Sequence, residues 1–244
     1  MLEESLRIGT CLSKILNTQA VEDLGFSLTW NQRVMKIGIT GSSGAGKSSL
    51  INQLAKRLLA LGYSIAILLI DPSSRLTGGS LLADRTRLDP NLLSQGVFIR
   101  SMSSGNSPDG LPERLSLVLH FLENEIFDVI LIETIGVGQD STSIRDFSDI
   151  LITLPSNDIG DIMQYFKMGS FEVADYIFFN KSDLNEQGKS SRNENLVTEF
   201  LSTKDWGDAR PPQPFFGNTV TNNGMEDLLH NLEEDLREKI RNAE

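Results

Sequence analysis

The sequence predicts an α/β fold in which a mostly parallel, doubly wound sheet carries helices on both faces. Short apolar runs alternate with helical patterns along the chain, which is typical of this class. The run 65–70 is apolar throughout, as parallel strands covered on both faces usually are. A glycine-rich stretch, residues 41–48, separates a strand pattern from a helix pattern, as in folds that bind ligands beyond the carboxyl ends of their strands.

Hydrophobic periodicity places the individual elements. Strands are expected at residues 34–39, 65–70, 97–99, 129–132, 150–154 and 176–179. Helices are expected at residues 48–61, 111–125 and 224–240, and residues 1–30 form a short helical lead-in ahead of one domain spanning 31–244. The polar stretch 185–214 is expected to be loop with at most one helix.

Composition excludes several classes of protein. The 22 basic and 33 acidic residues give a net charge of −11, which repels phosphate backbones and disfavours a general nucleic-acid binder. One cysteine and two histidines cannot build a disulfide framework or a Cys/His metal cluster. The longest aliphatic run has far fewer than the ~20 residues that span a bilayer, and the N-terminus lacks the pattern of a secretory signal. We therefore expect a cytoplasmic protein without a membrane partner.

Residues 41–48 match the P-loop pattern G-x-x-x-x-G-K-[ST] in full and predict a P-loop NTPase. Backbone N–H groups of such a loop face phosphate oxygens at a helix N-terminus. Lys47 is expected to reach the β and γ phosphates, and Ser48 to ligate Mg²⁺. The expected phosphate-binding residues are Gly41, Ser42, Ser43, Gly44, Ala45, Gly46, Lys47, Ser48 and Ser49.

Residues 180–183 read Asn-Lys-Ser-Asp and follow an expected strand, as the guanine-specificity motif N-K-x-D does. The Asp183 carboxylate can accept hydrogen bonds from guanine N1–H and the exocyclic amine, which adenine cannot offer. Asn180 can bond the base or brace the P-loop, and the stem of Lys181 can lie along the purine face. The pattern therefore predicts a guanine nucleotide, GTP or GDP.

Acidic residues end two further strands. Glu133 closes an apolar strand and begins E-x-x-G, where GTPases usually have D-x-x-G. Its carboxylate can hold Mg²⁺ directly or through water, and the following glycine can sense the γ phosphate. Asp71 ends another strand and opens a loop, 71–87, that is rich in glycine and hydroxyl groups. This loop has the composition of a switch that orders around Mg²⁺ and γ phosphate.

Four motifs in this order and spacing give a family resemblance over about residues 35–183: the P-loop, D-P-S-S-x-x-T-G-G-S, E-T-I-G-V-G-Q and N-K-S-D. The chain resembles the G-protein chaperones of adenosylcobalamin-dependent acyl-CoA mutases, of which the methylmalonyl-CoA mutase-associated GTPase is the type member. The resemblance implies GTP hydrolysis that gates cofactor loading and protects a mutase or its cobalamin-binding domain. It also implies that Asp71, Asp84 and Glu133 surround Mg²⁺ and that Lys47 and Glu133 are catalytic.

The resemblance extends to three other places. Residues 159–169 are similar to the family's third switch and make Lys167 a catalytic candidate, although Ile162 stands where the family has Glu. Asn218 and Thr219 lie where a second base-binding loop would be, without its usual Ser-Ala. Family members continue into a helical dimerisation arm that we expect to be absent here, because the sequence ends at Glu244. A nucleotide-dependent homodimer is a further expected partnership.

Two other functions remain open at this stage. The chain could be a nucleotide-gated scaffold with negligible hydrolysis, or a small-molecule kinase whose lid uses Arg75, Arg85 and Arg87. Nickel-loading GTPases of the same class are disfavoured because they need Cys/His clusters. Partitioning ATPases are disfavoured because they carry an extra P-loop lysine where this chain has Ser42.

Overall fold

The structure is a computed structural model that describes residues 2–17, 31–71, 87–105, 107, 110–134, 138–155, 171–181, 189–207 and 210–243. Its strands are β1 (Met35–Gly41), β2 (Ile65–Asp71), β3 (Phe98–Ser103), β4 (Val129–Glu133), β5 (Ile150–Leu154), β6 (Tyr176–Phe179) and β7 (Gln213–Phe216). Its helices are α1 (Leu2–Asn17), α2 (Lys47–Ala60), α3 (Asn91–Ser94), α4 (Leu115–Glu123), the 3₁₀ helix η3 (Gly138–Phe147), α6 (Lys189–Thr203) and α7 (Glu226–Asn242).

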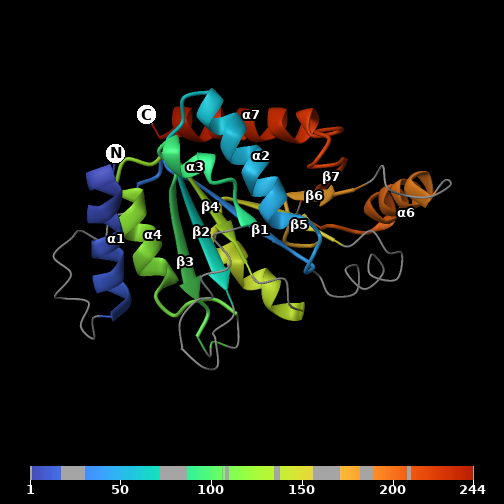
Figure 1. The fold of residues 1–244 in the computed structure, drawn as a ribbon. Helices are drawn as coiled ribbons and strands as arrows, with labels where there is room; N and C mark the ends of the chain where they lie inside the picture. Colours follow the sequence, from blue (N-terminus) through green and yellow to red (C-terminus); the bar gives the residue numbers. More distant parts are fainter. Residues whose placement is uncertain are drawn as a thin grey trace.

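The strands form one seven-stranded sheet in the order β3-β2-β4-β1-β5-β6-β7, and all neighbouring pairs are parallel. From β1 the chain runs to β2 and β3, returns to β4 beside β1, and continues through β5, β6 and β7 on the other side, so the sheet is doubly wound. Figure 1 shows helices on both of its faces. The predicted fold class is therefore confirmed.

Each face of the sheet has its own apolar core. On one face, α2 and α7 pack over alternate residues of the central strands, such as Ile37 and Leu131. On the other face, α1 and α4 pack over the intervening residues, such as Leu68 and Ile130. All seven residues of β2 are buried, which explains why residues 65–70 are apolar without alternation. Among the described residues, no helix combines the length and the hydrophobicity that crossing a bilayer would require.

The expected elements agree with the structure at most positions. All six expected strands are present, and the three expected helices correspond to α2, α4 and α7. The single helix allowed within 185–214 is α6. The strand β7 is absent from the prediction, because it has four residues, includes Pro214 and lies at a sheet edge, where proline is tolerated. The lead-in forms α1 and packs against α4, while the proposed boundary at residue 30 falls outside the described residues.

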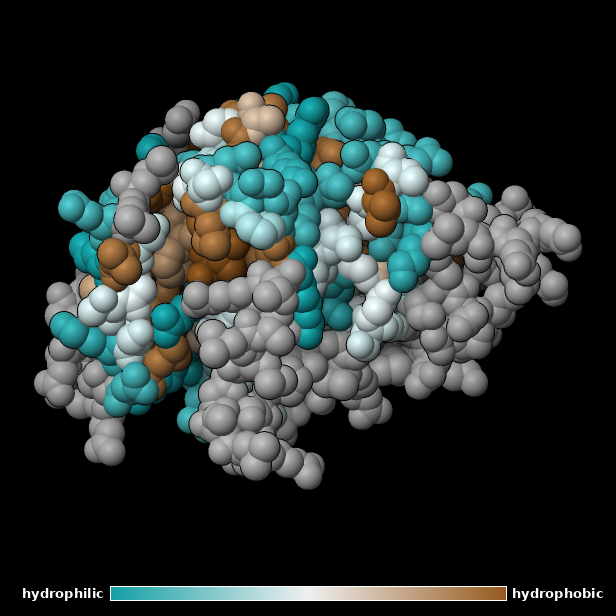
Figure 2. Space-filling model, in the orientation of Figure 1, coloured by the Kyte–Doolittle hydropathy of each residue, from teal (hydrophilic) through white to brown (hydrophobic). Residues whose placement is uncertain are grey.

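An apolar groove lies beside the other edge of the sheet. It has a volume of about 840 Å³ between α1 and the α3–β3 segment, and its rim carries Leu6 and Leu93, which are 64% and 58% exposed. Figure 2 shows apolar side chains in a recess on this side of the molecule, within a largely hydrophilic surface.

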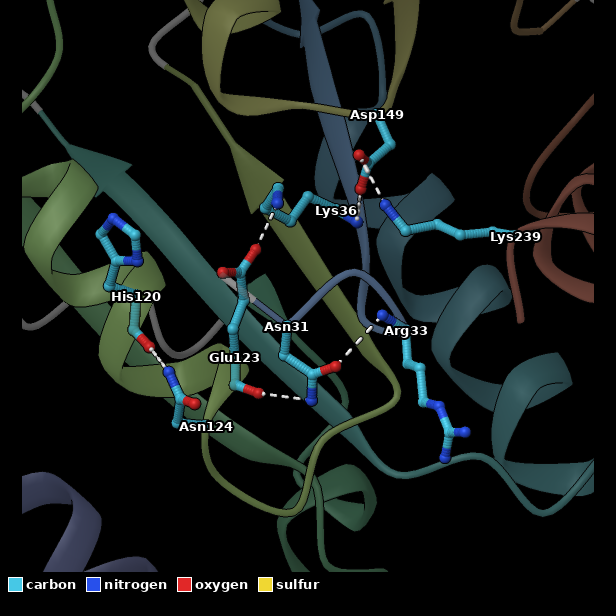
Figure 3. A network of polar contacts seen from close by, with 8 residues as sticks. All are labelled: Asn31, Arg33, Lys36, His120, Glu123, Asn124, Asp149 and Lys239. Carbon is cyan, nitrogen blue, oxygen red and sulfur yellow. Dashed lines mark hydrogen bonds and ion pairs between the residues drawn. The ribbon is translucent and has the colours of Figure 1, made fainter. Parts of the chain in front are cut away.

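A network of charged groups surrounds the amino end of β1 (Figure 3). The Lys36 amine pairs with Glu123 of α4, and the Lys36 backbone N–H donates to Asp149 at 2.7 Å. Asp149 also pairs with Lys239 of α7 at 2.6 Å, so the network joins both helical layers to the sheet. The Glu123 side chain is fully buried, and burial raises the pKa of its carboxyl group while Lys36 opposes that shift. Burial also lowers the pKa of the neighbouring His120.

Replacing Lys36 by methionine should leave the Glu123 carboxylate buried without its counter-ion. We expect Lys36→Met to lower the free energy of unfolding by about 3–5 kcal/mol at neutral pH, measured by urea denaturation. The pKa of Glu123 should then rise further above its value in the unfolded chain. A carboxyl group whose pKa is higher in the folded than in the unfolded chain stabilises the fold at pH values below its unfolded pKa. This stabilisation is lost as the pH rises through the folded pKa. The stability deficit should therefore be smaller at pH 5 than at pH 8.

The control is the double variant Lys36→Met/Glu123→Leu, which removes both charges. It should recover most of the lost stability and lose the added pH dependence. A deficit in Lys36→Met that is the same at pH 5 and pH 8 would contradict a role for the buried carboxylate.

Candidate functional site

The glycine-rich loop joins β1 to α2 at the carboxyl end of the central strand. The β1–β5 pairing continues into the loop, because the Ser42 N–H donates to the Leu154 carbonyl at 3.1 Å. The loop then turns through Gly46, whose left-handed backbone (φ 101°) immediately precedes α2. Ser43 and Gly44 are exposed, and Ser49 lies in the first turn of α2. Because the first N–H groups of a helix have no partner within the helix, this helix end is suited to bind an anion.

The Lys47 side chain folds back across the loop. Its amine donates to the carbonyls of Gly41 at 2.9 Å and Ser42 at 3.0 Å, and the residue is only 8% exposed. Burial lowers the pKa of Lys47, the carboxylate of Glu133 opposes that shift, and the guanidinium of Arg87 adds to it. A partly desolvated cation held this close to the helix N-terminus is suited to bind phosphate oxygens.

Ser48 and Glu133 meet although 85 residues separate them in the sequence. The Ser48 hydroxyl donates to the two Glu133 carboxylate oxygens at 3.0 and 3.2 Å, and Glu133 is 7% exposed. Neighbouring ligands of an octahedral Mg²⁺ lie about 3 Å apart, since each metal–oxygen bond is ~2.1 Å. The hydroxyl and carboxylate therefore fit the ion that the sequence predicts.

Asp71 ends β2, the strand on the far side of β4 from β1, and it is buried. It lies two residues beyond Leu69, which pairs with Glu133, so both acids are at the same edge of the sheet. Within the described part of the chain, no group of three or more His, Cys, Asp or Glu side chains is placed to hold a metal. The donor set instead suits Mg²⁺, which usually takes one or two carboxylates together with phosphates and waters.

Asn180, which follows β6, connects the predicted base-recognition segment to the P-loop. Its side-chain amide donates to the Ala45 carbonyl at 2.9 Å, and its Oδ1 accepts from the Thr219 N–H at 3.0 Å and the Thr219 hydroxyl at 3.2 Å. Asn180 is 3% exposed, so these contacts are protected from water. These contacts make Asn180 a brace of the P-loop, which is one of the two roles that the sequence left open; the other role, bonding the base, stays a prediction.

Lys181 and Asn218 complete this connection. The Lys181 amine donates to the Gly44 carbonyl at 3.0 Å, and its backbone is left-handed (φ 59°). The Asn218 side chain accepts from the N–H groups of Val220 and Thr221, which forms a tight turn after β7. The predicted second base-binding loop therefore lies directly against Asn180.

The remaining predicted residues, Asp84, Lys167 and Asp183, lie outside the described residues, as do most of the loop 71–87 and the third switch. Their roles stay predictions.

Sequence reasoning missed two sets of contacts at this edge. Gln53 of α2 donates to the Thr219 carbonyl at 2.9 Å and so supports the second loop from the helix. Thr134 donates to Thr40 of β1, the residue before the P-loop, at 3.0 Å. No motif marks Gln53. Thr134 belongs to the motif E-T-I-G-V-G-Q, but this motif does not indicate a hydrogen bond to Thr40, so spacing alone could not have found these partners.

The parallel sheet, the complete P-loop and the residues that converge on it define a P-loop nucleotide-binding protein. A family model described as methylmalonyl Co-A mutase-associated GTPase MeaB matches residues 16–243. The chain belongs to this family.

Two relatives illustrate the range of the similarity. GTPase ArgK of Escherichia coli is 34% identical over 168 residues, which is 69% of this chain and 50% of the relative. The methylmalonic aciduria type A homolog of Caenorhabditis briggsae, a mitochondrial protein, is 35% identical over 170 residues, which is 69% of this chain and 40% of the relative. The chain spans about half the length of the curated relatives it matches.

Solved structures support the same fold. The crystal structure of a LAO/AO transport system kinase aligns with a TM-score of 0.72 at 21% identity, covering 98% of this chain and 76% of that one. The hydrogenase maturation factor HypB of Archaeoglobus fulgidus aligns with a TM-score of 0.58 at 18% identity, covering 96% and 99%. At these identities the likeness concerns the fold alone.

Gly46 is a position where a side chain would disturb the contact between the P-loop and Asn180. A Cβ atom there would lie 2.0 Å from the Asn180 amide nitrogen. Because the left-handed backbone is also unfavourable for alanine, Gly46→Ala should cost about 3 kcal/mol of stability from strain and lost hydrogen bonds. Urea unfolding of the protein without nucleotide measures this cost.

Gly44→Ala is the matched control, since Gly44 is also left-handed (φ 75°) but has no atom within 4 Å of its Cβ position among the described residues. It should cost only about 1 kcal/mol. Equal losses in the two variants would show that backbone strain, not the Asn180 contact, decides the cost.

Proposed function

We propose that this protein binds and hydrolyses GTP with Mg²⁺. The observation that carries the proposal is the convergence of the P-loop, the Ser48–Glu133 pair and the Asn180 brace at one edge of the sheet. This edge, beyond the carboxyl ends of parallel strands, is where doubly wound folds bind their ligands.

The residues divide the work of binding. Backbone N–H groups of the loop and the Lys47 amine hold the phosphates, and they supply positive charge where negative charge develops during phosphoryl transfer. Ser48 and Glu133, with Asp71 and Asp84, are the residues that would hold Mg²⁺, which neutralises charge on the β and γ phosphates when bound. Family membership supports hydrolysis, with free phosphate as the product.

Guanine recognition rests on Asp183, with Lys181, Asn218 and Thr219 around the base. Asn180 and Lys181 contact the P-loop, and this supports the assignment. Because Asp183 follows them closely in the sequence, one nucleotide could reach both Asp183 with its base and the P-loop with its phosphates. An aspartate at this position selects guanine over adenine through two hydrogen bonds that only guanine can donate.

Asp183→Asn should exchange a carboxylate acceptor for an amide that can donate to the 2-oxo group of xanthine. GTP affinity should fall and xanthosine triphosphate affinity should rise, each by at least about tenfold, since hydrogen bonds to charged groups contribute ~1.5–3 kcal/mol. Calorimetric titration of both nucleotides measures the change. Unchanged GTP affinity in this variant would show that Asp183 does not recognise the base.

Hydrolysis is distinguished from kinase activity by the product of the reaction. Hydrolysis releases free phosphate, whereas a kinase yields a phosphorylated acceptor.

The proposed biological role is to gate cofactor loading and to protect an adenosylcobalamin-dependent acyl-CoA mutase. Its support is membership in a family described by association with methylmalonyl Co-A mutase. In this role, the loops at Asp71, at Glu133 and at residues 156–169 respond to the γ phosphate and to the partner. Lys167 would approach the phosphates only when the mutase docks.

A cation supplied only in the docked state should speed hydrolysis without tightening GTP binding. Lys167→Ala should therefore keep the GTP affinity of the parent but lose most of the acceleration, an effect of about 10-fold or more by analogy with arginine fingers. GTPase rate against the concentration of a cognate mutase or its cobalamin-binding domain measures both proteins. Equal stimulation would exclude Lys167, and the absence of stimulation by any cobalamin mutase would contradict the chaperone role.

A further inference from the structure

Thr134 is the first residue beyond β4, and it is attached to β1 twice. Its backbone N–H donates to the Ile39 carbonyl at 3.0 Å, which extends the β1–β4 ladder by one step. Its hydroxyl donates to the Thr40 hydroxyl at 3.0 Å. Thr40 immediately precedes the first glycine of the P-loop, so this bond ties the end of β4 to the strand that carries the loop.

Thr134 and Glu133 point to opposite faces of the sheet, because side chains alternate along a strand. The Glu133 carboxylate faces α2, where it contacts Ser48. The Thr134 hydroxyl faces the layer that holds α1, α4 and η3, as Thr40 does. The backbone that positions the carboxylate is therefore fastened from the reverse side by the adjacent residue.

This attachment lies in a dry part of the molecule. Thr40 is 1% exposed and Thr134 is 5% exposed, so water does not compete for their hydrogen bond. A third threonine, Thr153 of β5, pairs with Thr40 in the sheet register and is fully buried. Within the described part of the chain, the Thr153 hydroxyl has no hydrogen-bond partner. One row of the sheet thus contains a bonded hydroxyl pair and an unbonded hydroxyl of the same residue type.

We infer that Thr134 is a positioning residue for the nucleotide site. Its bond to Thr40 holds the end of β4 at the height where the Glu133 carboxylate faces Ser48, and so sets the affinity of this pair for the metal of a Mg²⁺–nucleotide complex. The inference rests on the proposed function, because it assumes that Ser48 and Glu133 serve Mg²⁺.

The test is the binding of a fluorescent, non-hydrolysable GTP analogue at increasing Mg²⁺ concentration. Thr134→Val keeps the shape of the side chain and removes the donor. The Mg²⁺ concentration for half-maximal binding should rise roughly 2- to 10-fold, the equivalent of one neutral hydrogen bond. Affinity for the analogue in EDTA should not change, because phosphate and base contacts stay intact. Thr134→Ser keeps the hydroxyl and should restore the Mg²⁺ dependence of the parent.

Thr153→Val is the matched control, since it makes the same change in the same buried row without breaking a hydrogen bond. It should leave the Mg²⁺ dependence unchanged, and an equal shift in this variant would overturn the inference. Thr40→Val removes the acceptor of the same hydrogen bond and should raise the required Mg²⁺ concentration as Thr134→Val does. It also tests the inference if Thr134→Val does not fold. The double variant Thr40→Val/Thr134→Val should shift no further than either single variant, because both break one bond.

The behaviour of the parent protein distinguishes a failure of the proposed function from a failure of the role of Thr134. A parent that does not bind the analogue in a Mg²⁺-dependent manner would refute the proposed function and this inference with it. A parent that does so, with Thr134→Val unshifted, would refute the role of Thr134 alone.

Discussion

The described part of the site depends on the hydrogen bonding of β1 to β4 on one side and to β5 on the other. The register pairs Gly41 with Leu154 and Ile39 with Glu133, so the start of the P-loop lies level with the end of β5 and two residues beyond the end of β4. Because all these strands are parallel, every connection that follows them begins at the same edge. Residues that are far apart in the sequence thus reach one another through backbone geometry, and their side chains need only short reaches to meet.

The buried polar side chains of Asn180 and Glu133 are acceptable in an apolar surrounding because each one links two segments. Asn180 uses its amide and its carbonyl oxygen to bind the P-loop and the loop after β7 together. Glu133 accepts from Ser48 across the gap between β4 and α2. A buried group that lost its partner would incur a desolvation penalty, so these contacts favour one relative arrangement of the loops.

The sequence could predict what local patterns encode. Apolar runs identified the central strands, and the P-loop and the Asn-Lys-Ser-Asp motif identified Lys47 and Asn180 as site residues. It could not predict β7, since the pairing of Phe215 with Phe178 of the sheet gives that segment its conformation and Pro214 argues against a strand. Likewise, the partnership of Thr40 with Thr134 joins residues 94 positions apart. This contact can be predicted only when the strand order and the register of the sheet are known, and local composition determines neither.

The charged network around Lys36 has a mechanical consequence for the opposite end of the same strand. Lys36 ties the amino end of β1 to α4 and, through Asp149 and Lys239, to α7. The rest of β1, which pairs with β4 over residues 35–39 and with β5 over residues 37–41, then connects this anchor to Gly41. A strand restrained in this way resists sliding along its axis, so β1 keeps its register with β4 and β5. If the protein binds nucleotide as proposed, we expect any displacement on a change of nucleotide to occur in the connections after the strands, while β1, β4 and β5 stay in register.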